Sequence, residues 1–73
     1  MAALAMDMPA ELNRLGKDGA VTVARGPLVI LAHGLMAIER TQRRRFWISS
    51  AGGRMSAREA ERALQRWQGK RRT

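Results

Sequence analysis

Arginine is the residue type whose number and spacing point most clearly to chemistry in this chain. It supplies 12 of the 14 basic residues among 73. A guanidinium group binds a phosphate or a carboxylate through two parallel hydrogen bonds, whereas a lysine acts as a point charge. Four arginines recur at intervals of four residues: Arg54, Arg58, Arg62 and Arg66. On a helix the last three would form one ridge, and Arg54 would extend it from the preceding turn. Such a ridge is either a binding surface for anions or a solvated face.

A second arginine cluster lies beside two aromatic residues. Arg43, Arg44 and Arg45 run directly into Phe46 and Trp47. Guanidinium groups pair with phosphates while aromatic rings stack on bases, so this composition suits nucleic acid. On a strand the two aromatic side chains would point to opposite faces, and a sheet would bury at most one of them. We therefore treat Trp47 as a candidate contact residue, with a place in the core as the alternative.

The positive charge is concentrated in one half of the chain. Residues 1–39 hold three basic and four acidic residues, a net charge of −1, whereas residues 40–73 hold eleven basic and two acidic residues, a net charge of +9. Such asymmetry predicts a surface that binds a polyanion. The partner would be DNA, RNA or an acidic protein surface. The predicted contact set is Arg43, Arg44, Arg45, Trp47, Arg54, Arg58, Arg62, Arg66, Lys70, Arg71 and Arg72.

Residues suited to catalysis or metal binding are scarce. Cysteine is absent, and His33 is the only histidine. A lone histidine without several well-placed carboxylates cannot build a metal site. We find no nucleophile and base at a sequence spacing typical of a catalytic motif, and no glycine-rich phosphate loop. We predict no catalytic residue, no metal site and no cofactor, and hence a protein that is not an enzyme.

The arginine ridge requires a helix near the C-terminal end, and this helix is well marked. Ser56 and Glu59 have the spacing of a capping box, in which each side chain accepts a hydrogen bond from the other residue's backbone N–H. An apolar stripe ending in Trp67 follows at helical intervals. The sequence predicts a helix over residues 57–68, preceded by a turn at 49–53, with Trp67 in the core.

Three elements are expected in the first part of the chain. Residues 8–15 read as a short helix, because Asp7 can cap it and its apolar residues recur at intervals of four and three. Residues 17–19 have the composition of a turn. Residues 20–25 contain β-branched side chains in an alternating pattern, which predicts a strand.

Residues 28–43 admit two interpretations. Leu28, Leu31 and Leu35 recur at helical spacing, and in a helix the arginines that follow would lie near its negative end. The first four residues could equally form a buried strand that pairs with the strand before it. We favour strands here, with residues 45–49 completing a small sheet.

The predicted fold class is α+β. A short N-terminal helix would precede a small antiparallel sheet, with a C-terminal helix packed on it; the alternative is a mostly α fold with residues 28–43 as a central helix. We expect one domain over residues 1–73, with flexible tails at 1–6 and 69–73. Because so short a chain builds a small core, we also expect self-association, as a homodimer through the apolar residues from Leu28 to Ile38.

Neither a membrane span nor an export signal is predicted. The N-terminal apolar run lacks a basic leader and is interrupted by Asp7. The longest apolar stretch, residues 28–38, is about half the length that a membrane helix requires. We expect a cytoplasmic protein, located in the host cytoplasm if a phage encodes it.

Two DNA-binding families share short patterns with this chain. The run Arg44-Arg45-Phe46-Trp47-Ile48, a glycine turn and then residues 56–60 resembles the last strand and helix of the arm-type domain of phage integrases, over about a third of the chain. Residues 20–25 with residues 55–64 resemble the strand and second helix of ribbon–helix–helix repressors, although about thirty residues separate them here. These resemblances imply a sheet with a helix and assign no family.

Three functions fit these observations. The first is a nucleic-acid-binding accessory or regulatory protein of phage or mobile-element origin. The second is an inhibitor of a host nucleoprotein complex, of the anti-CRISPR type. The third is a small structural or assembly subunit. Charge distribution favours nucleic-acid binding.

Overall fold

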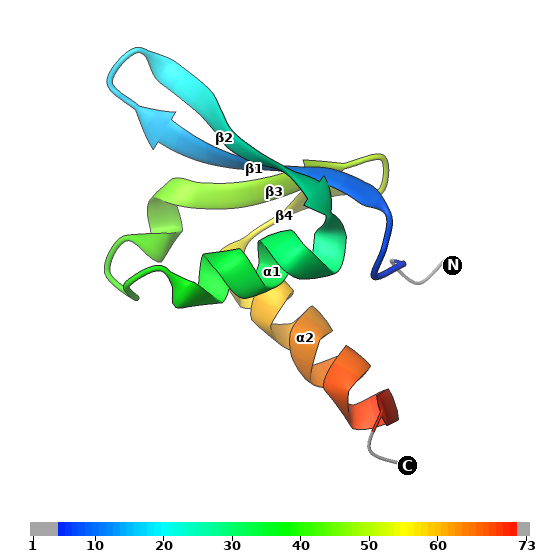
Figure 1. The fold of residues 1–73 in the computed structure, drawn as a ribbon. Helices are drawn as coiled ribbons and strands as arrows, with labels where there is room; N and C mark the ends of the chain where they lie inside the picture. The colour runs from blue at the N-terminus through cyan, green and yellow to red at the C-terminus, as the bar shows by residue number, and fades with distance from the viewer. Residues whose placement is uncertain (1–4, 72–73) are drawn as a thin grey trace.

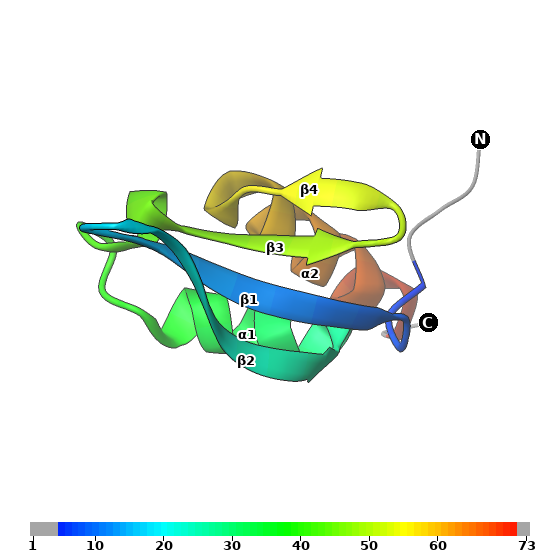
Figure 2. The same ribbon diagram turned by 90° about the horizontal axis from the view of Figure 1, so that it is seen from above.

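The computed structural model describes the backbone of residues 5–71 and the side chains of residues 5–68. Its four strands form one antiparallel sheet in the order β2-β1-β3-β4. Both helices lie on the same face of this sheet, and the opposite face is left uncovered by either (Figures 1 and 2). The predicted α+β class is confirmed. The elements are β1 (Pro9–Gly16), β2 (Gly19–Pro27), α1 (Leu28–Ala37), the 3₁₀ turn η1 (Arg43–Arg45), β3 (Phe46–Ser50), β4 (Gly53–Met55) and α2 (Ala57–Arg71).

The N-terminal hairpin corrects the prediction of a short helix at residues 8–15. That segment is β1, and Gly16 pairs with Gly19 across a two-residue turn, which leaves β1 beside the correctly predicted strand β2. Ala10 and Leu12 are buried while Glu11 between them is not, so the apolar pattern that matters has a period of two. Gly19 has a φ of 119°, a conformation that glycine adopts without steric cost. A two-turn helix has little stability by itself, whereas this strand is hydrogen-bonded to a neighbouring strand on each side.

Helix α1 occupies the segment for which strands were favoured, so the helical alternative was the correct one. Leu28, Ala32 and Leu35 are fully buried, and Leu31 is nearly so. A strand would point alternate residues to opposite faces, whereas the helix turns all four toward the sheet and α2. The helix is shorter than the expected 28–43, since it ends at Ala37. Its first two N–H groups donate to the carbonyls of Met6 and Met8 at 2.8 Å each.

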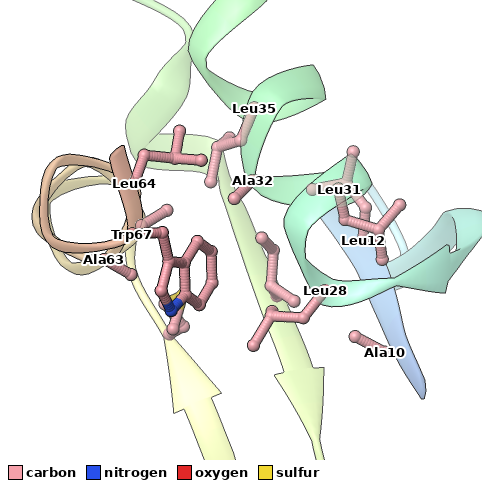
Figure 3. Packing of buried hydrophobic residues seen from close by; sticks show 12 residues of the cluster. Ala10, Leu12, Leu28, Leu31, Ala32, Leu35, Ala63, Leu64 and Trp67 are labelled. Carbon is pink, nitrogen blue, oxygen red and sulfur yellow. The ribbon is translucent and has the colours of Figure 1, made fainter. Parts of the chain in front are cut away.

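A single apolar layer fills the space between the sheet and the two helices (Figure 3). Leu35 and Ala32 of α1 face Leu64 and Trp67 of α2, and Trp67 is 8% exposed, as predicted for a core residue. The leucine stripe of α1 is part of this core. The homodimer expected through residues 28–38 would therefore have to form through the side chains of α1 that are not buried in the core. Among the large apolar side chains of α1, Ile30 is the one that lies mostly exposed.

The C-terminal half follows the sequence more closely. β3 and α2 lie where strand and helix were predicted, and the helix continues to Arg71 rather than stopping at residue 68. The turn predicted at 49–53 is shorter and leads into β4, a strand of three residues that the sequence did not indicate. Of the predicted tails, residues 1–4 and 72–73 lie outside the described residues. Within the described part of the chain, no helix is both long and apolar enough to cross a membrane.

We predict that Leu35→Ala lowers the free energy of unfolding by about 2–5 kcal/mol, because it leaves a cavity between α1 and α2. Ile30→Ala removes a side chain from the same helix that is 60% exposed, and we expect a change within about 0.5 kcal/mol. Urea denaturation followed by circular dichroism measures both. Equal losses in the two variants would contradict the assignment of Leu35 to the core.

Candidate nucleic-acid interface

Arginine side chains converge on a cleft between the connection that follows α1 and the first turn of α2. The cleft has a volume of about 510 Å³. Arg40 and Arg44 come from the connection, Arg58 comes from the helix, and all three are exposed. The remaining lining residues are Arg43, Ser56, Ala57 and Glu61, so four arginines and one acidic residue line the cleft.

The capping box that was predicted from the sequence positions Arg58. The backbone N–H of Ser56 donates to the Glu59 carboxylate at 2.8 Å, and the backbone N–H of Glu59 donates to the Ser56 hydroxyl at 3.2 Å. Hydrogen bonding from the Ser56 backbone lowers the pKa of Glu59 most, followed by hydrogen bonding from the Ser56 side chain and by the charge of Arg62. The helix therefore starts at a defined residue, and Arg58 is held in its first turn.

The three consecutive arginines of η1 point in different directions. A 3₁₀ helix has about three residues per turn, so neighbouring side chains are separated by a third of a turn. Arg43 donates to the carbonyls of Met36 and Ile38 at 2.7 and 2.9 Å, which caps the C-terminal end of α1. Arg44 lines the cleft, and Arg45 lines a different hollow. The cluster that looked like one contact patch in the sequence is thus divided, and the guanidinium of Arg43 is engaged in the fold.

A second basic hollow lies on the other side of η1, with a volume of about 630 Å³. It brings Arg45 together with Arg14 and Lys17 of the N-terminal hairpin, and no acidic residue lines it. The sequence had placed these last two residues in the neutral half of the chain. Their contribution to the basic surface was missed because the pairing of β1 with β3, a long-range feature that sets Arg14 opposite Phe46, brings this hairpin beside η1. Arg40 was also missed, since it stands apart from the triple run.

Trp47 lies on the open face of the sheet. It pairs with Asn13 across β1 and β3, while Phe46 pairs with Arg14 and packs against the core. The predicted separation of the two aromatic residues onto opposite faces is confirmed. The guanidinium carbon of Arg54 lies 4.4 Å from the centre of the Trp47 ring, a cation–π contact. Arg54 therefore stands over the open face rather than extending the arginine ridge of α2.

A small hollow of about 220 Å³ joins Trp47 to the arginine cleft. Arg44 and Ser56 line both of them, so the two are neighbours that share a wall. The remaining lining residues are Phe46, Trp47, Arg54 and Glu59. The cleft thus continues to the edge of the open sheet face.

The floor beside Trp47 is held rigidly by side-chain hydrogen bonds. Asn13 is 7% exposed; its amide donates to the Ser49 hydroxyl at 2.9 Å and accepts from the Thr22 hydroxyl at 2.9 Å. These bonds tie the three strands β2, β1 and β3 together at the point where the register of β1 and β2 shifts by one residue. A bulge of this kind strengthens the local twist.

The other predicted contact residues occupy separate places. Arg62 and Arg66 are exposed along α2, beyond the cleft. The side chains of Lys70, Arg71 and Arg72 lie outside the described part of the molecule. Among the side chains of residues 5–68, the one ion pair joins Arg25 to Glu11 at 3.0 Å, so the cleft arginines form none there. The described residues also contain no group of three or more histidine, cysteine or acidic side chains that could hold a metal ion.

The capping box gives a prediction on pH. Because the pKa of Glu59 is lowered in the folded protein, its contribution to stability is present above the ordinary carboxyl pKa of 4.5 and is lost as the pH falls through the lower folded value. We expect wild type to be more stable than Glu59→Gln at pH 7, with the difference shrinking on acidification. Glu61→Gln removes the same charge from the same helix without touching Ser56. If the free energy of unfolding of both variants depends on pH in the same way, the capping role of Glu59 is wrong.

Arg43 and Arg44 provide a matched test of the different roles assigned to the arginines of η1. Arg43→Gln removes charged hydrogen bonds to two carbonyls, and we predict a loss of about 1–3 kcal/mol in the free energy of unfolding. Arg44→Gln changes an exposed residue and should stay within about 0.5 kcal/mol of wild type. Chemical denaturation distinguishes them, and a larger loss for Arg44→Gln would overturn the assignment.

Comparison with known proteins adds no family to this description. No family model matches the chain, and no characterised protein or solved structure matches it. The arginine cleft, the hollows beside it and the half-buried indole of Trp47 are the features that bear on its function.

Proposed function

We propose that this protein is a non-enzymatic nucleic-acid-binding accessory or regulatory protein that acts in the cytoplasm and binds the phosphate backbone through the arginine cleft. The observation that carries the proposal is the convergence of Arg40, Arg44 and Arg58 from separate segments on one cleft. None of them forms an ion pair with a side chain among residues 5–68. Like charges brought together repel, and an anion in the cleft would relieve that repulsion.

The extent of the basic surface favours a polymer over a small anion. The cleft is followed on one side by the hollow that holds Arg54, and a hollow lined by Arg14, Lys17 and Arg45 lies across η1. A single phosphate would occupy one of these sites. A nucleic acid carries a phosphate at every nucleotide and can use several of them together. An extended acidic protein surface is the alternative partner, and the experiment below distinguishes it.

Binding to labelled oligonucleotides should weaken steeply with salt, because each neutralised phosphate releases counterions. We predict that Arg44→Gln reduces the slope of log affinity against log salt by roughly 0.7 on single strands and 0.9 on duplexes. Fluorescence anisotropy between about 50 and 200 mM salt measures the slope.

Arg25→Gln is the matched control for charge. Arg25 lies on β2, at the edge of the sheet opposite β4, and is paired with Glu11 of β1. Its loss should leave the salt slope unchanged. An equal change in both variants would mean that net charge, not the cleft, governs binding. Absence of binding at about 50 mM salt would overturn the proposal and leave an acidic protein surface as the partner to test.

A further inference from the structure

We infer that the nucleic acid is single-stranded and that one of its unpaired bases stacks on the indole of Trp47. This inference rests on the proposed function and specifies its ligand. It starts from the position of Trp47, which is half-buried and lies on the opposite side of β3 from the core-packed Phe46. That side belongs to the sheet face that neither helix covers (Figure 2). Its pairing partner Asn13 lies beside it as part of a hydrogen-bonded floor. The indole is therefore presented on a rigid platform and not on a mobile loop.

The chemistry around the indole suits a base and its phosphate together. Arg44 lines both the cleft and the hollow that contains Trp47. A phosphate bound by Arg44 would leave the attached nucleotide next to the aromatic ring. Stacking on a flat aromatic surface requires a base whose face is free, and bases inside a duplex are already stacked on both sides. The arrangement therefore selects a single strand.

Arg54 already covers the Trp47 ring at 4.4 Å, so a base must compete with it. An exposed cation–π contact changes an equilibrium by roughly two- to five-fold. Stacking of one base on an aromatic side chain changes affinity by about five- to one-hundred-fold. Because stacking is the stronger contact, the base displaces the guanidinium, and the released Arg54 is free to pair with a neighbouring phosphate. Glu59 also lines this hollow, but its carboxylate accepts the hydrogen bond from Ser56.

The test compares oligothymidine and oligouridine of about 16 nucleotides with a duplex that carries the same number of phosphates. Wild type should bind the single strands more tightly than the duplex. Trp47→Leu should weaken binding to single strands about five-fold or more, whereas Trp47→Phe, which keeps an aromatic face, should retain most of the affinity. Duplex binding should be unchanged in both variants, which also shows that they are folded.

Tryptophan fluorescence gives a second readout that does not depend on the leucine variant. Single strands should quench the wild-type signal and should leave that of Trp47→Phe unchanged, because its remaining Trp67 is buried in the core. Equal affinity for single strands and duplexes, or unchanged affinity in Trp47→Leu, would overturn the inference while the proposed function stands. Absence of binding to every oligonucleotide would overturn both.

Discussion

The packing of α1 is the constraint on which the rest of this structure depends. The helix contacts β1, β2, β3 and α2, and its stripe of buried leucines supplies much of the apolar layer. A chain of 73 residues without cysteine has little other means of holding a sheet and two helices together. Once α1 and α2 both cover one face of the sheet, the opposite face is left open, and it carries Trp47 beside the hydrogen-bonded Asn13.

The same packing decides where the charge goes. The core is a single layer, so the guanidinium groups of the connection and of α2 have to lie at its margin, where α1 ends and α2 begins. Arg43 binds the carbonyl groups at the end of α1, and that contact holds the connection that carries Arg40 and Arg44. One arginine thus stabilises the backbone from which its neighbours reach the cleft. A residue that caps α1 and two residues that line separate hollows thus follow one another directly in the sequence.

Part of the fold and of the candidate site could be predicted because the signals are local. The capping box of Ser56 and Glu59 lies within one helical turn, and the alternation of Phe46 and Trp47 needs only a strand to separate them. β1 and α1 could not be predicted in this way. Short apolar runs satisfy more than one period, and the choice between helix and strand depends on what the segment packs against. The same limit explains why Arg14 and Lys17 were missed.

The sequence by itself determined the capped C-terminal helix, the strands β2 and β3, the α+β class and the concentration of charge in the second half of the chain. Each of these follows from residue types and from spacings of a few residues. Only the tertiary structure decided that residues 9–16 pair as a strand and that the leucine stripe forms a helix. It also decided that Arg43 caps α1 while Arg44 lines the cleft and Arg45 a separate hollow. These features depend on contacts between distant segments, which no local period encodes. The charged half of the chain is therefore a property of the sequence, whereas the cleft and the position of Trp47 on the open face of the sheet are properties of the fold.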